Sequence, residues 1–231
     1  MTAHTPVVAI QARLSSSRFP GKVLAKLQGR TVIEHVTNCF DKMGLPCFVL
    51  TSEDVSDNPL VEYLQGIGQD VFRGPLSDVL SRFQFFAGHF SFSHIIRVSG
   101  DSPLMHPEVA WEVISDEEAA TFDISTNVFP RTFPKGQSVE MLKTETLTAL
   151  SNFNLLSTHR EHVTSFIYEN PEFFRISNHF NCIDFSSYNM CVDYPDDVER
   201  LTKMLEFFDI SISDGFPSWP ELCQLLTSRS W

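Results

Sequence analysis

The chain has 231 residues, of which 42% are hydrophobic, and its 29 acidic and 17 basic side chains give a net charge of -12. This length fits one well-filled α/β domain with at most a small appended lobe. The five cysteines are odd in number, scattered and without C-x-x-C spacing, which argues against a disulfide framework and a structural zinc site. No apolar run approaches the ~18 residues of a membrane span, and the start lacks the cations of a signal peptide. We therefore expect a cytoplasmic protein with no membrane partner.

The first predicted element is a buried strand that runs directly into a cationic loop. Residues 7–10 are β-branched or small and apolar, which is typical of a strand buried on both faces of a sheet. Residues 11–22 are polar, and the Pro20-Gly21 pair marks a turn. This loop carries three consecutive hydroxyls and three cations, which are Arg13, Arg18 and Lys22. Because open α/β sheets bind ligands beyond the carboxyl ends of their strands, the loop is the first candidate binding site.

The loop lies in a segment without acidic residues. An even spread of the 29 acids would put about four in the first 33 positions, but the first acid is Glu34. In an acidic chain such a positive patch indicates a bound polyanion, and a solvated basic loop without a ligand is the alternative. Neither G-x-x-x-x-G-K-[ST] nor G-x-G-x-x-G is present. Phosphates would therefore be held by arginine forks, a lysine and loop amides.

The residues of the loop resemble a family signature. Gln11-Ala12-Arg13, Ser16, Arg18 and Pro20-Gly21-Lys22 are similar to the QARxxSxRxPGK motif of the sugar cytidylyltransferases. This group contains acylneuraminate and 3-deoxy-manno-octulosonate cytidylyltransferases, and the resemblance is greatest to its spore-coat polysaccharide biosynthesis branch. It continues in family order through nearly the whole chain, over residues 71–83, 95–108, 125–136, 160–176 and 192–201.

Strand and helix patterns alternate after the loop. Thr31 and Glu34 have the spacing of a capping box at the start of a helical period. Residues 46–52 form the next predicted strand, and residues 58–66 form a short helix. A further helix is expected to begin with Ser77 as its N-cap. This β, α, β, α order predicts a mostly parallel sheet.

Asp101 follows another predicted strand, at residues 94–98, on a tight loop that contains glycine and proline. A carboxylate in this position can hold Mg²⁺ against phosphates, because magnesium takes carboxylate and phosphate oxygens together. An Asx-turn within the loop is the alternative. Pro107 then suits the first position of a helix with an acidic run at 116–118, which we interpret as solvated surface.

The second half of the chain gives weaker patterns. Residues 123–140 are turn-rich and are not predicted as a core element. Thr158 and Glu161 have capping-box spacing and predict a helix that continues through Val163. Residues 216–231 predict a short amphipathic helix that packs on the body or on a partner.

Residues 189–192 are predicted as a last buried strand that ends at Asp193. Asp193 would then meet Asp101 across the top of the sheet and complete a metal site with two carboxylates. Asp196 and Asp197 are expected instead to complement the dipole of the following helix.

The resemblance implies the fold, the reaction and the partners. The fold is α/β, a Rossmann-like nucleotidyltransferase of the GT-A type, which is a three-layer sandwich with a mostly parallel mixed sheet. One domain spans residues 1–231, and residues 123–180 supply a sugar pocket and a dimerisation lobe. The reaction joins a sugar, expected to be a nonulosonic or octulosonic acid, to CMP from CTP with loss of pyrophosphate, for surface polysaccharide or glycan biosynthesis. Mg²⁺ is the implied cofactor and a homodimer the implied assembly, and no nucleic acid is expected as a partner.

Residue patterns and resemblance together assign roles. The nucleotide-binding residues are Gln11, Ala12, Arg13, Ser16, Arg18, Lys22, Thr51, Ser52, Ser77, Asp78 and Arg82. The catalytic residues are Arg13, Lys22 and Asp101, and the metal ligands are Asp101 and Asp193. The substrate-binding residues are Arg131, Glu140, Arg160 and His162. Ser138 and Lys135 stand where relatives of the spore-coat branch often have Asp. The identity of the sugar is therefore the part of the resemblance that carries over least to this chain.

Two alternatives stay open. The same loop could serve another nucleotide, most plausibly GTP or UTP. The chain could also be a non-catalytic member that binds nucleotide or a partner as a regulatory module. The presence of Asp101 and Asp193 together with the cationic loop favours catalysis.

Overall fold

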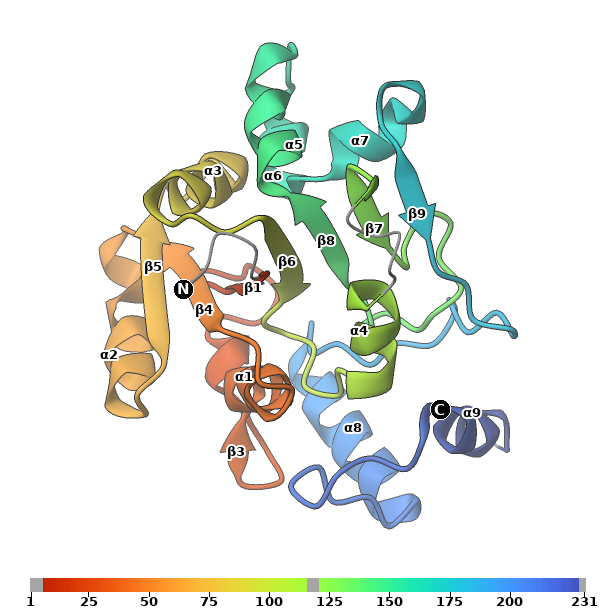
Figure 1. Cartoon of the computed structure of the whole chain (residues 1–231). Helices are drawn as coiled ribbons and strands as arrows, with labels where there is room; N and C mark the ends of the chain where they lie inside the picture. Colours follow the sequence, from red (N-terminus) through yellow and green to blue (C-terminus); the bar gives the residue numbers. More distant parts are fainter. Residues whose placement is uncertain (1–5, 116–120, 229–231) are drawn as a thin grey trace.

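A seven-stranded sheet forms the centre of the computed structural model, which describes residues 6–115 and 121–228 (Figure 1). The strands follow the order β5-β4-β1-β6-β8-β7-β9 across the sheet. They are β1 (Val7–Gln11), β4 (Cys47–Ser52), β5 (Asp70–Gly74), β6 (His94–Ser99), β7 (Ile124–Thr126), β8 (Glu140–Lys143) and β9 (Ile176–Asn178). Within this seven-stranded sheet, over the described residues, only β8 runs antiparallel to its neighbours, so the prediction of a mostly parallel mixed sheet is confirmed.

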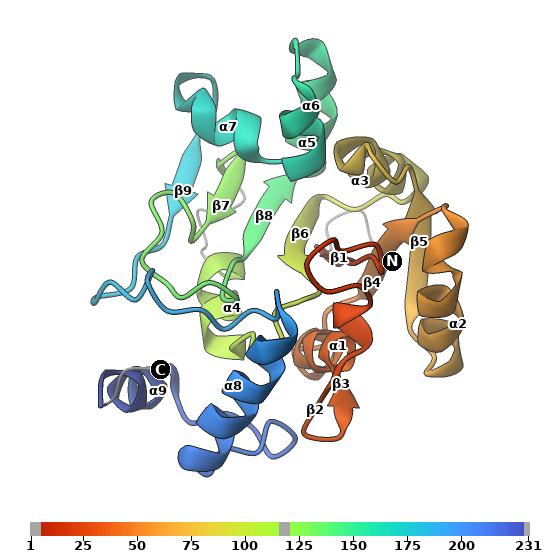
Figure 2. The ribbon, with the colours of Figure 1, turned by 180° about the vertical axis from the view of Figure 1, so that it is seen from behind.

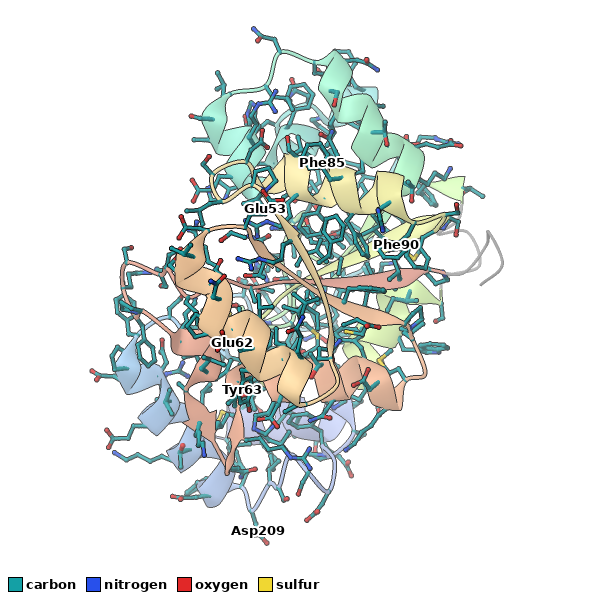
Figure 3. All side chains as sticks on the ribbon, turned by 90° about the vertical axis from the view of Figure 1, so that its left-hand side faces the viewer. Glu53, Glu62, Tyr63, Phe85, Phe90 and Asp209 are labelled. Atoms are coloured by element: carbon teal, nitrogen blue, oxygen red, sulfur yellow. The ribbon has the colours of Figure 1, made fainter. Side chains whose placement is uncertain are left out.

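Helices cover both faces of this sheet and make three layers. They are α1 (Val32–Lys42), α2 (Asn58–Gly66), α3 (Val79–His89), α4 (Pro107–Ile114), α5 (Thr144–Ala149), α6 (Ser157–His162), α7 (Ser165–Glu169), α8 (Pro195–Phe207) and α9 (Trp219–Thr227). In β1, Val8 packs in a core with α1, α2 and α4, whereas Val7 packs in a core with α3, α5 and α7. Figure 3 shows α3 with Phe85 and α2 with Glu62 on opposite sides of the strands. This arrangement confirms the predicted α/β three-layer class.

The sheet is built outward from β1 on both sides. The units β1-α1-β4-α2-β5 extend to one edge of the sheet, and the chain then returns to β6 on the other side of β1. β1 pairs in parallel with both β4 and β6. The carboxyl ends of β1 and β6 therefore meet where the strand order reverses, which is the position at which open α/β sheets bind their ligands.

Packed phenylalanines fix α3 to the sheet. The fully buried Phe86 lies against Phe48, Phe72 and Phe92, with ring centroids 5.2, 5.3 and 6.0 Å away. Truncation of such a ring to alanine typically costs about 3–5 kcal/mol of stability. Because α3 also carries Arg82, this packing sets the position of that guanidinium.

A third apolar cluster joins the carboxyl-terminal helices to the body. The hairpin of β2 (Lys26–Leu27) and β3 (Arg30–Thr31) places Leu27 in a cluster with α8 and α9 (Figure 2). Trp219, Leu222 and Leu226 of α9 are buried in this cluster, which confirms the predicted tail helix, although residues 229–231 lie outside the described part. None of the helices over residues 6–115 and 121–228 is long and apolar enough to cross a membrane.

Local predictions in the first half of the chain need one correction. Thr31 caps α1 and forms the predicted capping box with Glu34. The prediction of Ser77 as the N-cap of α3 is wrong, because Asp78 caps this helix by accepting the N–H of Ser81 at 2.9 Å. A carboxylate at this position also complements the helix dipole. The acidic run at 116–118 lies outside the described residues.

Three predictions for the second half are wrong. Residues 123–140 belong to the core, since they contain β7 and lead to the first residue of β8. All three residues of β7 are buried. The helix predicted to continue through Val163 divides into α6 and α7, because Val163 has a φ of 56°, which a right-handed α-helix does not allow. Residues 189–192 form no strand but a single bridge between Asn189 and Lys135.

Candidate active site

A polar cleft of about 320 Å³ opens at the carboxyl ends of β1 and β6. Its walls come from the loop after β1, from α3, from the end of β6 with the turn that follows, and from α6. The lining residues are Gln11, Ala12, Arg13, Ser16, Ser17, Arg18, Lys22, Val23, Val79, Arg82, Arg97, Ser99, Asp101, Glu161 and His162. The cleft thus lies where the strand order reverses and contains the cationic loop.

A buried carboxylate and a tight turn hold the loop after β1. Asp57 is fully buried, and one of its oxygens accepts the N–H of Leu14 at 2.7 Å. Its other oxygen accepts the hydroxyls of Thr51 and Ser52. Gly21 donates its N–H to the Leu14 carbonyl at 2.9 Å, with a φ of 74° that favours glycine. The loop therefore presents its cations from a braced backbone.

Gly100 brings the turn after β6 against this loop. Its N–H donates to the Gln11 carbonyl at 2.9 Å. A Cβ at position 100 would lie 2.9 Å from both Ala12 and Ile33, closer than real Cβ contacts. Only glycine allows this approach, which places the next residue, Asp101, beside the cations.

Lys22 lies between the two predicted metal ligands. Its Nζ donates to Asp101 Oδ2 at 2.5 Å and to Asp193 Oδ1 at 2.9 Å. Arg18 also donates to Asp193, at 2.8 Å. Asp193 reaches this point because the N–H of Val192 donates to the Asp101 carbonyl at 2.9 Å. The structure therefore brings the two carboxylates together, and their role as metal ligands stays a prediction.

Charge holds this cluster together. Burial alone would lower the pKa of Lys22, but the charge of Asp101 and hydrogen bonds with both carboxylates outweigh burial, so the pKa is raised. Lys22 is therefore fully cationic at neutral pH. With Arg18 as the second cation, two positive charges balance the carboxylates of Asp101 and Asp193.

The donor set around Asp101 suits a hard cation. Its Oδ1 accepts the Ser99 hydroxyl at 2.6 Å, and Asp193 supplies a second carboxylate. Mg²⁺ takes such oxygen ligands and completes its octahedron with phosphate oxygens and water. Over residues 6–115 and 121–228, no group of three or more His, Cys, Asp or Glu side chains could hold a metal ion. The pair fits a shared Mg²⁺ only with that additional coordination.

Of the residues predicted to surround the base, some line the cleft and others do not. Arg82 lines the cleft, and its buried guanidinium donates to the carbonyls of Pro75 at 2.8 Å and Leu76 at 3.3 Å. Burial lowers the pKa of Arg82 to about 10. Thr51 and Ser52 are fully buried away from the lining with their hydroxyls on Asp57, so direct contact with the base does not fit their placement. Both hydroxyl hydrogens are already donated to a carboxylate, so neither is available to a ligand.

Ser77 and Asp78 also lie outside the lining of the cleft. Ser77 is exposed, and Asp78 caps α3 and accepts a hydrogen bond from Arg160 at 2.9 Å. Arg160, predicted to bind substrate, is thus turned toward α3 rather than into the cleft. His162, from the same short helix α6, does line the cleft.

A buried polar chain leads from Gln11 toward β8. Arg97 donates to Gln11 Oε1 at 3.0 Å and forms an ion pair with Glu140, whose second oxygen accepts the Tyr168 hydroxyl at 2.6 Å. Burial lowers the pKa of Arg131, and the nearby negative charge of Glu140 acts in the opposite direction. The Nη1 of Arg131 is buried without a hydrogen-bond partner among the described residues. The buried carboxylate of Glu140 thus pairs with Arg97 and lies close enough to Arg131 to act on its charge.

Four residues of this region were missed from the sequence. Asp57 braces the loop, Arg97 and Tyr168 belong to the buried chain, and Glu161 pairs with Arg13 at 3.6 Å. A usable signal existed for Arg97, because a charge inside the apolar run of a buried strand needs a partner. The other three offered no local pattern.

Comparison with known proteins places the chain in a family. The model of the cytidylyltransferase family matches residues 7–214. The spore coat polysaccharide biosynthesis protein SpsF of Bacillus subtilis is 27% identical over 210 residues, which cover 85% of this chain and 85% of that protein. The structure of a cytidylyltransferase from Leptospira borgpetersenii serovar Hardjo-bovis has a TM-score of 0.83 and 25% identity, and the match covers 98% of each chain.

A second solved structure is similar in fold. A CMP:2-keto-3-deoxy-manno-octonic acid synthetase complexed with CTP has a TM-score of 0.70 at 15% identity, over 88% of this chain and 99% of that one. The family match over residues 7–214 confirms the resemblance seen in the sequence, and the chain belongs to the cytidylyltransferase family.

Proposed function

We propose that the protein is a CTP-dependent sugar cytidylyltransferase that joins an acidic sugar, of the nonulosonic or octulosonic acid class, to CMP with release of pyrophosphate. The product would serve surface polysaccharide or glycan biosynthesis. One observation carries the proposal. In the cleft of this chain, which belongs to the cytidylyltransferase family, Arg18 and Lys22 of the braced loop donate hydrogen bonds to Asp101 and Asp193.

The loop suits a triphosphate. Arg13 and Arg18 offer planar guanidinium forks, and Lys22 offers a compact point charge, which together match several phosphate oxygens. Arg13 is paired with Glu161, and Lys22 with Asp101 and Asp193. Triphosphate binding would therefore exchange protein carboxylates for phosphates. Cytosine as the base is supported by the family and by the neighbour complexed with CTP.

In the proposed reaction the anomeric hydroxyl of the sugar attacks the α-phosphorus of CTP. The bond from that phosphorus to the bridging oxygen breaks, pyrophosphate leaves with the electron pair of that bond, and the hydroxyl proton passes to water. Arg13, Arg18 and Lys22 align the phosphates and neutralise their charge, which is the main requirement of such transfers. Mg²⁺ held by Asp101 and Asp193 would add charge neutralisation at the phosphate oxygens.

Two buried guanidinium groups favour an acidic sugar. Arg97 pairs with the carboxylate of Glu140, and the charge of Glu140 also acts on Arg131. Arg97 Nε and Arg131 Nη1 are both buried without a partner among the residues that the structure describes. Each unpaired buried donor costs about 1–3 kcal/mol. A sugar carboxylate that reached these donors would accept hydrogen bonds from them and balance the excess positive charge. The hydroxyls of a neutral hexose could accept the hydrogen bonds but would not balance the charge.

Calorimetric titration with CTP, GTP, UTP and ATP in the presence of Mg²⁺ tests the nucleotide assignment. We expect CTP to bind at least about tenfold more tightly than the others, a difference of about 1.4 kcal/mol. Comparable binding of GTP or UTP would replace cytidylyl transfer by transfer of another nucleotide. Tight CTP binding without turnover of any acidic sugar would indicate a non-catalytic, regulatory member.

A further inference from the structure

Lys22 stands where a divalent cation would bridge Asp101 and Asp193. Its ammonium donates to both carboxylates, at 2.5 and 2.9 Å. We propose that Lys22 is the internal counter-ion of the metal site: it holds the two carboxylates until a triphosphate draws its Nζ away, so that the nucleotide binds before or together with the metal. This inference rests on the triphosphate and metal site of the proposed function.

The ammonium and the metal compete for the same oxygens. Mg²⁺ binds carboxylate oxygens at about 2.0–2.1 Å, so an ion shared by Asp101 and Asp193 would lie next to the present position of Nζ. Two cations at such separation repel strongly in a site with little solvent. The Lys22 side chain is 11% exposed, so water screens this repulsion only weakly. Metal binding therefore requires Nζ to leave.

Lys22 is the mobile member of this cluster. Its Nζ ends a flexible four-carbon stem, whereas each aspartate carboxylate is only one carbon from its Cα. Asp101 is fixed by the Ser99 hydroxyl at 2.6 Å. The N–H of Asp193 donates to Asp197 at 2.8 Å, at the start of α8. A short swing of Lys22 into the cleft that it lines would move the ammonium from carboxylate to phosphate without moving the backbone.

The ligand count leads to the same order of binding. Asp101 and Asp193 provide two carboxylates, and no larger group of His, Cys, Asp or Glu ligands exists within residues 6–115 and 121–228. Mg²⁺ commonly relies on substrate phosphates in such sites. The triphosphate would thus both remove the competing ammonium and supply the missing oxygens. A permanent structural salt bridge is the competing interpretation of the same contacts.

Binding of Mn²⁺ to the full chain without nucleotide, followed by electron paramagnetic resonance, separates these interpretations. The wild-type protein should bind Mn²⁺ only in the millimolar range. Lys22→Met should bind it at least about tenfold more tightly, because it removes the one cation that contacts both carboxylates and leaves only Arg18, on Asp193. Lys22→Arg keeps the cation and should behave like the wild type.

Two further variants test whether the effect depends on the position of the lost charge and on the carboxylate of Asp101. Lys26→Met removes the same charge from an exposed position on β2 and should leave Mn²⁺ affinity unchanged. Adding Asp101→Asn to Lys22→Met should abolish the gain. Equal Mn²⁺ affinity of Lys22→Met and wild type overturns the proposal. If Lys22→Met does not fold, the wild-type titration decides, because micromolar Mn²⁺ binding without nucleotide also overturns it.

The measurement is independent of the nucleotide assignment. It uses no nucleotide, so a gain in Lys22→Met stands even if CTP is not the substrate. Conversely, CTP turnover by the wild type together with unchanged Mn²⁺ affinity in Lys22→Met would retain the proposed function and remove the counter-ion role.

Discussion

Asp57→Asn tests whether a buried carboxylate braces the cationic loop after β1. One oxygen of Asp57 accepts the Leu14 N–H at 2.7 Å. The other accepts the Thr51 hydroxyl at 3.1 Å, the Ser52 N–H at 3.2 Å and the Ser52 hydroxyl. Asparagine has a single acceptor oxygen and an NH₂ donor, so it cannot accept on both sides. Its oxygen would face the side with three donors, and its NH₂ would face the N–H of Leu14.

The cost follows from these contacts. The Leu14 N–H would lose its partner, which costs about 1–3 kcal/mol when the group is buried. Loss of the charge on the remaining bonds adds roughly 1 kcal/mol. The sum of about 2–4 kcal/mol corresponds to a fall in Tm of about 5–15 °C for a chain of this size. Because Leu14 opens the cationic loop, CTP affinity should also fall about tenfold, or about 1.4 kcal/mol.

Thermal unfolding by circular dichroism and calorimetric titration of CTP below the Tm measure both effects. Asp54→Asn is the matched control, because Asp54 is an exposed acid three residues earlier that only caps a short 3-10 helix. We expect this control to bind CTP like the wild type. A wild-type Tm and a wild-type CTP affinity in Asp57→Asn would refute the bracing role.

Three other substitutions address the cleft, the sugar pocket and the pH dependence. Arg13→Ala should weaken CTP binding by about 1.5–3 kcal/mol, the scale of a charge-assisted hydrogen bond. It should leave the Tm unchanged, because the side chain is 39% exposed. Unaltered CTP affinity in calorimetry would contradict this prediction. Arg131→Met removes a buried unpaired donor, so the Tm should stay the same or rise. The KM for an acidic sugar should rise, whereas the KM for CTP should not. Equal changes in both KM values would contradict a role of Arg131 in sugar binding. Burial acts to raise the pKa of Glu34, but hydrogen bonds from Thr31 and Tyr63 outweigh burial and lower it from 4.5. Its stabilising contribution is thus present above the unfolded pKa and is lost as the pH falls through the folded one. In urea unfolding, Glu34→Gln should therefore be less stable than wild type at neutral pH and approach it in acid, and a constant gap would show the reasoning to be wrong.

The parallel half of the sheet could be predicted because its signals are local. The apolar runs 7–10, 46–52 and 94–98 each precede a helical period, and the Thr31 capping box marks one helix start within four residues. The region around β7 could not be predicted, because this strand has three residues and is followed by a buried polar segment. There Asn127 satisfies its side chain by accepting the Val139 N–H at 3.0 Å and donating to Gln137. Polar residues that a pattern assigns to turns are here paired inside the core.

The candidate site was predictable where charge and strand position coincide. Arg13 and Asp101 lie just after the ends of β1 and β6, Lys22 lies further along the loop after β1, and all three line the cleft. Contacts between distant residues were not predictable. Asp57 meets Leu14 across 43 positions, and Arg97 meets Gln11 across 86. The sequence also does not show that Lys22 faces the acids, since pairing depends on side-chain direction. Mg²⁺ and the homodimer stay predictions.

Mass spectrometry of the products tests the central claim most directly. The full chain would be incubated with CTP, Mg²⁺ and a panel of nonulosonic and octulosonic acids, each matched with a neutral sugar of similar size. We expect a CMP-sugar and pyrophosphate from at least one acid, no product from the neutral sugars, and no product from Asp101→Asn under the same conditions. A nucleotide-sugar formed equally from GTP or UTP, or formed from the neutral sugars in preference to every acid, would contradict the claim.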